Sequence, residues 1–79
     1  MIEKKLDKII SKSLKIPLKK INNKISPDNC EEWDSFNFLS LIVNIEKGFN
    51  IKFNYNEMIS LRNYKNILKL IKKKTKNKN

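Results

Sequence analysis

Apolar residues recur at helical spacing in three separate segments, and this periodicity limits the fold of the chain more than any other feature. In the first segment, where lysines fill the opposite side, the apolar positions are Ile2, Leu6, Ile9, Ile10 and Leu14. Residues 35–48 and 63–71 repeat the spacing of three and four that places apolar side chains on one helix face. A chain of 79 residues has room for one small domain. We therefore predict an all-α fold with three main helices.

The segment between the first two helices predicts a long loop. Pro17 and a Ser-Pro-Asp-Asn turn signal at residues 26–29 oppose a helix in residues 16–33. The apolar residues of this loop are too many for a free linker, so we expect them to pack against the helices: Ile16, Leu18, Ile21, Ile25, Cys30 and Trp33.

After the second long helix, the sequence predicts a short loop and one short helix. Gly48 should end the long helix, because glycine adopts positive φ without strain. Residues 50–54 alternate apolar and polar side chains, but no second strand is available to pair, so we predict a loop. Asn54 or Asn56 can cap a short helix that carries Met58, Ile59 and Leu61. We place the single domain at residues 1–72 and expect residues 73–79 to be a disordered basic tail.

The formal net charge of +10 favours a nucleic acid or an anionic membrane surface as partner. However, the 18 basic residues include only one arginine, Arg62, although arginine's planar fork is the better group for recognising phosphates and bases. The charge is also unevenly distributed, since residues 26–49 carry one lysine against five carboxylates. Much of the lysine content is typical of a coding bias toward AT-rich codons. The acidic middle segment has either resisted that bias or been kept acidic for a partner.

The chain has no histidine and a single cysteine, Cys30. An internal disulfide needs two cysteines, and metal sites and acid–base catalysis near neutral pH most often use histidine. We therefore expect no metal site and no enzyme activity. No apolar run reaches the length of about 18 residues that a membrane span needs, and no leader segment is visible, so we expect a cytoplasmic protein.

The helix predicted at residues 35–48 carries two apolar stripes. The broad stripe has the spacing of a core-facing side and consists of Phe38, Leu41, Ile42, Ile45 and Phe49. The narrow stripe, Phe36, Leu39 and Val43, lies on another side of the same helix. Either the helix is buried on two sides, or the narrow stripe faces a partner protein. We favour a partner, because a small chain can scarcely bury both sides and exposed apolar patches often mark binding sites.

The run Glu32-Trp33-Asp34-Ser35-Phe36, followed by Leu39, Leu41-Ile42, Ile45-Glu46, Phe49 and Ile51, resembles the acyl carrier protein family. The resemblance covers about residues 2–72 and implies an acyl-carrier-like bundle of three main helices plus one short helix, forming a single carrier domain. In that family a serine after an aspartate, at the start of the second helix, carries covalent 4′-phosphopantetheine. The matching cofactor-binding residues here are Ser35, as the attachment point, and Asp34.

The resemblance implies a carrier of acyl or aminoacyl thioesters in a specialised lipid, polysaccharide or peptide pathway. It implies three partners: a phosphopantetheinyl transferase, an acyl- or aminoacyl-loading enzyme, and a downstream acyltransferase or synthase. The partner-binding positions would be Phe36, Leu39, Val43, Glu46 and Lys47. Because Asn37, Ser40 and Lys47 stand where the family commonly has acids, we expect partners with a less basic, more apolar docking patch. We expect a monomer with no nucleic acid partner and no stable membrane insertion.

The position of Ser35 also has a physical rationale. A serine where a loop enters a helix lies near unpaired N–H groups and the positive end of the helix dipole, which favour an attached phosphodiester. Three alternatives stay open. Ser35 or Asp34 only caps the helix; the chain is an unmodified adaptor; or it is a small basic helical module that binds nucleic acid or an anionic membrane surface through the lysines of its first helix and tail.

Overall fold

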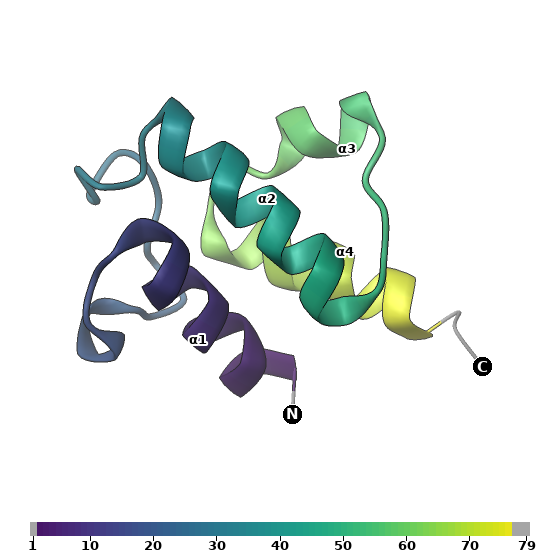
Figure 1. The fold of residues 1–79 in the computed structure, drawn as a ribbon, viewed down its shortest axis with the longest axis horizontal. Helices are drawn as coiled ribbons and strands as arrows, with labels where there is room; N and C mark the ends of the chain where they lie inside the picture. The colour runs from purple at the N-terminus through teal and green to yellow at the C-terminus, as the bar shows by residue number, and fades with distance from the viewer. Residues whose placement is uncertain (1, 77–79) are drawn as a thin grey trace.

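A computed structural model describes residues 2–76, in which the chain forms four α-helices and a short 3₁₀ helix (Figure 1). The elements are α1 (Ile2–Leu14), η1 (Leu18–Lys20), α2 (Ser35–Phe49), α3 (Tyr55–Ser60) and α4 (Tyr64–Lys76). A long loop joins α1 to α2, and the described residues contain no strand. The predicted all-α fold, with three main helices, one short helix and a long first loop, is confirmed.

The core forms where the apolar faces of α1, α2 and α4 meet. Leu6, Ile10 and Leu14 of α1 are completely buried, and they follow the helical spacing of four. The broad stripe of α2 supplies Leu41, Ile42 and Ile45, and α4 supplies Tyr64, Ile67 and Ile71. Each fully buried aliphatic side chain stabilises the fold by about 1.5–3 kcal/mol.

Two polar contacts between distant side chains orient α1 against its neighbours. Asn44 of α2 donates through Nδ2 to Oγ of Ser13, at 2.8 Å. The Tyr64 hydroxyl of α4 donates to Oδ1 of Asp7, at 2.6 Å. Burial and the neighbouring Asp7 carboxylate both raise the pKa of Tyr64, so the hydroxyl stays protonated and can donate.

The long loop packs against the helices, as its apolar content predicted. Ile16, Ile25, Cys30 and Trp33 are buried, and the backbone N–H of Tyr64 donates to the carbonyl of Ile25 at 3.0 Å. Burial raises the pKa of the Cys30 thiol, which therefore behaves as a small packed side chain. The prediction was wrong for Leu18, which lies in η1 and is 52% exposed.

The end of α2 differs from the prediction, because Asn50 and not Gly48 supplies the left-handed residue. Asn50 has φ 54° and ψ 52°, and its N–H donates to the carbonyl of Glu46. Asparagine tolerates this conformation better than other residues with a Cβ. Gly48 lies inside the helix, where an added Cβ would lie 2.7 Å from Cδ1 of Ile9. The absence of a side chain at Gly48 leaves room for the end of the Ile9 side chain of α1.

Helix α4 continues to Lys76, so the expectation of a disordered tail from residue 73 was wrong for residues 73–76. Lys72 pairs with Glu3 at 3.2 Å and Lys74 pairs with Glu57 at 2.9 Å, and these ion pairs attach the last turns of α4 to other elements. The rest of the expected tail, residues 77–79, lies outside the described residues. None of the described helices is both long enough and apolar enough to cross a bilayer.

Candidate functional site

Ser35 is the first residue of α2, and Asp34 before it is the N-cap. Asp34 has an extended backbone, and its Oδ1 accepts a hydrogen bond from the Asn37 N–H at 2.8 Å. The Asp34 carbonyl accepts the first helical bond, from the Phe38 N–H at 2.8 Å. The capping role therefore belongs to Asp34, and it leaves the exposed Ser35 side chain free of that task.

The loop behind Ser35 is attached firmly to the protein. Trp33 is 5% exposed, and its N–H donates to the carbonyl of Cys30 at 3.0 Å. Asn37 donates through Nδ2 to the carbonyl of Glu32 at 2.9 Å, which joins the loop to the first turn of α2. These contacts hold the backbone before Ser35 against the first turn of α2.

The start of α2 favours negative charge. The backbone N–H groups of Ser35 and Phe36 have no acceptor within the helix, because the first turn of any α-helix lacks preceding carbonyls. The helix dipole adds partial positive charge at the same place. An anion attached to the Ser35 hydroxyl would lie in this favourable field.

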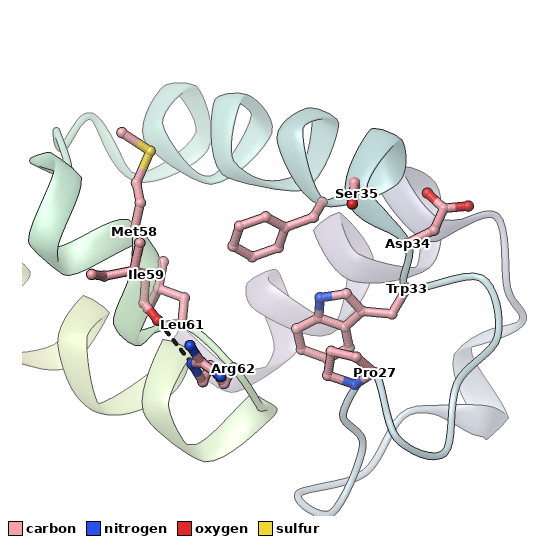
Figure 2. A pocket seen from close by; sticks show the side chains of 9 residues that line it. Pro27, Trp33, Asp34, Ser35, Met58, Ile59, Leu61 and Arg62 are labelled. Carbon is pink, nitrogen blue, oxygen red and sulfur yellow. Dashed lines mark hydrogen bonds between the residues drawn. The ribbon is translucent and has the colours of Figure 1, made fainter.

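A surface hollow of about 310 Å³ adjoins Ser35 (Figure 2). Figure 2 shows side chains from α3 and the following turn on one side and side chains from the long loop on the other. The lining is mostly apolar and consists of Pro27, Trp33, Asp34, Ser35, Phe38, Met58, Ile59, Leu61 and Arg62. The Nε of Arg62 donates to the Ile59 carbonyl at 3.2 Å.

Sequence reasoning missed the wall of this hollow. Pro27 lies more than 30 positions before Met58 and Arg62 in the chain and meets them only through the fold. No local sequence motif predicts that contact. The one available signal was the apolar content of the short helix after residue 54, which indicates packing against another segment.

The narrow apolar stripe of α2 is exposed and begins next to Ser35. Phe36 is 79% exposed, Leu39 62% and Val43 45%. Since most large apolar side chains avoid water, a continuous exposed row of three on one helix indicates a binding surface. Val43 also borders a second hollow, of about 370 Å³, at the far end of α2, together with Glu46, Lys47, Asn50, Ile51 and Lys52.

Glu46 and Lys47 differ in their freedom to meet a partner. Glu46 is half-buried, and its Oε2 accepts a hydrogen bond from the Phe53 N–H at 2.8 Å. This bond holds the loop after α2 against the helix. Lys47 is exposed. Because Glu46 is the only acid in α2, the outer side of this helix offers a partner apolar and basic groups.

The neighbourhood of Ser35 contains no side chain suited to activating its hydroxyl. Asp34 is the only titratable neighbour on the same turn, and one of its oxygens already accepts the Asn37 N–H. An ordinary carboxylate is a poor base for a serine hydroxyl. Among residues 2–76, no group of three His, Cys, Asp or Glu side chains is placed to hold a metal ion.

Neither a scan against protein-family models nor a search of curated proteins found a match to this chain.

Proposed function

We propose that this chain is a carrier protein whose Ser35 receives 4′-phosphopantetheine from a separate transferase. The observation that carries the proposal is an exposed, uncommitted serine at the first position of a firmly anchored helix, bordered by a hollow and an exposed apolar stripe. This arrangement suits a hydroxyl that other proteins must reach.

The residues around Ser35 are suited to this group. The first turn of α2 favours the phosphodiester, and Asp34 preserves that turn by capping it. The mostly apolar hollow beside Ser35 offers a surface on which part of the arm can rest. When bound, the group supplies a thiol that holds an acyl or aminoacyl chain as a thioester.

The protein's own contribution is delivery. Phe36, Leu39 and Val43 offer partner enzymes an apolar row that leads to Ser35. The partners are a phosphopantetheinyl transferase, a loading enzyme, and an acyltransferase or synthase that consumes the cargo. Lys47 is exposed and Glu46 is bonded to the backbone, so α2 offers little negative charge to a partner. The docking patches of these partners are therefore less basic than those of enzymes that bind carriers with acidic helices.

Intact-mass measurement tests the proposal. Wild-type protein, Ser35→Ala and Ser40→Ala are each incubated with coenzyme A and a broad-specificity phosphopantetheinyl transferase. Ser40 is an exposed serine on the same helix and serves as the matched control. We expect one added phosphopantetheinyl group on wild type and on Ser40→Ala, and none on Ser35→Ala.

A wild-type chain that stays unmodified by a transferase active on a reference carrier would contradict the proposal. Modification of Ser35→Ala would also contradict it, because the attachment point would then lie elsewhere. In the first case the adaptor and the basic binding module are the remaining interpretations.

A further inference from the structure

Four chain segments meet at the end of the molecule away from Ser35, which we call the distal end. Glu3 at the start of α1 pairs with Lys72 near the end of α4, and the Lys5 ammonium lies 5.1 Å from the ring centre of Phe49 at the end of α2. Lys74 of α4 lies 5.9 Å from the ring centre of Phe53 in the loop after α2. In Figure 1 the start of α1 and the end of α4 lie toward the same side of the molecule. The 15 residues of α2 separate this end from Ser35 by about 21 Å.

Lysines gather at the distal end. The distal lysine cluster consists of Lys4, Lys5, Lys47, Lys52, Lys72, Lys73, Lys74 and Lys76, all exposed except the half-buried Lys74. Four acids, Glu3, Asp7, Glu46 and Glu57, belong to the same part of the molecule. Each acid is engaged: Glu3 with Lys72, Asp7 with the Tyr64 hydroxyl, Glu46 with the Phe53 N–H, and Glu57 with Lys74. The distal end therefore carries an excess of positive charge.

The end that holds Ser35 has a different charge balance. Within residues 15–34, four lysines are matched by four carboxylates, those of Asp28, Glu31, Glu32 and Asp34. Eight lysines and four nearby acids leave the distal end with a net charge of +4, whereas residues 15–34 sum to zero. The distal end is therefore the more positive of the two ends.

We infer that the distal lysine cluster binds an anionic phospholipid surface. Clusters of four to eight basic side chains are attracted to the negative surface potential of such membranes, and lysine serves as a point charge there. The cluster is assembled from several chain segments and is not a single helix that could enter a nucleic acid groove. The rings of Phe49 and Phe53 are at least half-buried, and ammonium groups lie over them, so neither is a free platform for stacking bases.

Binding in this way fixes the orientation of the molecule. With the distal end on the membrane, Ser35 points into water, where partner enzymes can reach it. The attachment is electrostatic and reversible, because the core-facing apolar residues of α1 and α4 are already buried and do not insert. It weakens as salt screens the lysines.

Co-sedimentation with vesicles tests this inference on the unmodified chain, independently of phosphopantetheine. The vesicles are phosphatidylcholine alone or with about one third phosphatidylglycerol. The distal variant combines Lys4→Gln, Lys52→Gln, Lys73→Gln and Lys76→Gln. The matched control combines Lys15→Gln, Lys19→Gln, Lys20→Gln and Lys24→Gln, so the two variants have equal net charge.

We expect wild type to bind only the anionic vesicles and to be released by added salt. Each lysine near an anionic surface contributes about fivefold to binding, so the distal variant should bind at least about 30-fold more weakly than wild type. The control variant should change by less than about threefold, because its lysines lie among balancing carboxylates. Circular dichroism confirms that both variants fold.

Three results would overturn the inference. The first is that wild type fails to bind anionic vesicles at low salt. The second is that the two variants lose binding equally, which would mean that only net charge matters. The third is that double-stranded RNA at the same phosphate concentration binds more tightly than the vesicles.

A separate measurement tests the orientation. It uses a Cys30→Ala background with a fluorophore attached to Lys73→Cys or to Ser35→Cys. Nitroxide-labelled headgroups should quench the first and not the second, and equal quenching would contradict the orientation.

Discussion

Helices α1 and α3 pack against the rest of the protein to very different degrees. α1 has Leu6, Ile10 and Leu14 completely buried, and Gly48 of α2 leaves room for its Ile9 side chain. α3 has six residues, none of them buried. It depends on a capping box between Asn54 and Glu57, and on the ion pair from Glu57 to Lys74.

This difference assigns distinct roles to the two sides of Ser35. α1 supports the second half of α2 through contacts with Asn44 and Gly48, and the bond from Asn37 to the Glu32 carbonyl holds the start of the helix. The α3 side forms one wall of the hollow and is free to open locally, because few buried contacts resist its displacement. This end of the molecule therefore combines a serine on an anchored helix start with an adjustable neighbouring surface.

Truncating one apolar side chain in α1 and one in α3 should give the largest difference between the two helices, measured as loss of unfolding free energy. Ile10→Ala in α1 should lower the free energy of unfolding by about 2–4 kcal/mol, because it leaves a cavity in the packed core. Met58→Ala in α3 should cost about 1 kcal/mol or less, since this side chain is only half-buried. Urea denaturation of both variants measures the difference. Equal losses would show that α3 is as much a part of the core as α1.

Removing the helix caps gives a smaller effect that sharpens the same contrast. Asp34→Ala should lower the free energy of unfolding by about 1 kcal/mol, because the Asn37 N–H loses its acceptor in a helix that the whole core needs. In α3, Asn54→Ala removes the side-chain oxygen that accepts the Glu57 N–H. The main effect of Asn54→Ala should be faster hydrogen exchange that is confined to the α3 amides. Exchange that rises throughout the protein would instead mean that α3 opens only together with the core.

Acid should loosen α3 before the rest of the protein, and this is the smallest expected effect. The Asn54 N–H and the Lys74 ammonium lower the pKa of Glu57 below the ordinary glutamate value of about 4.3. The contribution of Glu57 is therefore fully present above the ordinary value and is lost as pH falls through the lowered pKa. Amide exchange of α3 relative to α1, followed from pH about 6 to about 3, measures it. A Glu57→Gln variant should remove the pH dependence of this ratio.

Local periodicity predicted most of the fold, and packing between distant residues decided the rest. The helix positions, the exposed stripe of α2 and a capping asparagine for α3 follow from neighbouring residues, so they could be predicted. The structure decided between the two candidate caps, Asn54 and Asn56, in favour of Asn54. The position of Gly48 was misinterpreted because its role depends on Ile9, which is far away in the sequence. The extension of α4 depends in the same way on Glu3 and Glu57.

The candidate site was predictable only in part. Asp34 and Ser35 could be placed at a helix start from the sequence, because a loop signal and a helical period meet there. The hollow beside them could not, since its lining comes from three separate segments of the chain. Whether Ser35 or Asp34 acts as the cap also needed the backbone geometry.

The buried side chain of Trp33 gives the protein a built-in optical reporter. It is the only tryptophan of the chain, and it lines the hollow next to Ser35. Indole emission responds to the polarity of its surroundings, so a change in wavelength or intensity would signal when a group enters or leaves that hollow. The proposed loading and unloading of Ser35 could then be followed in real time without attaching a dye.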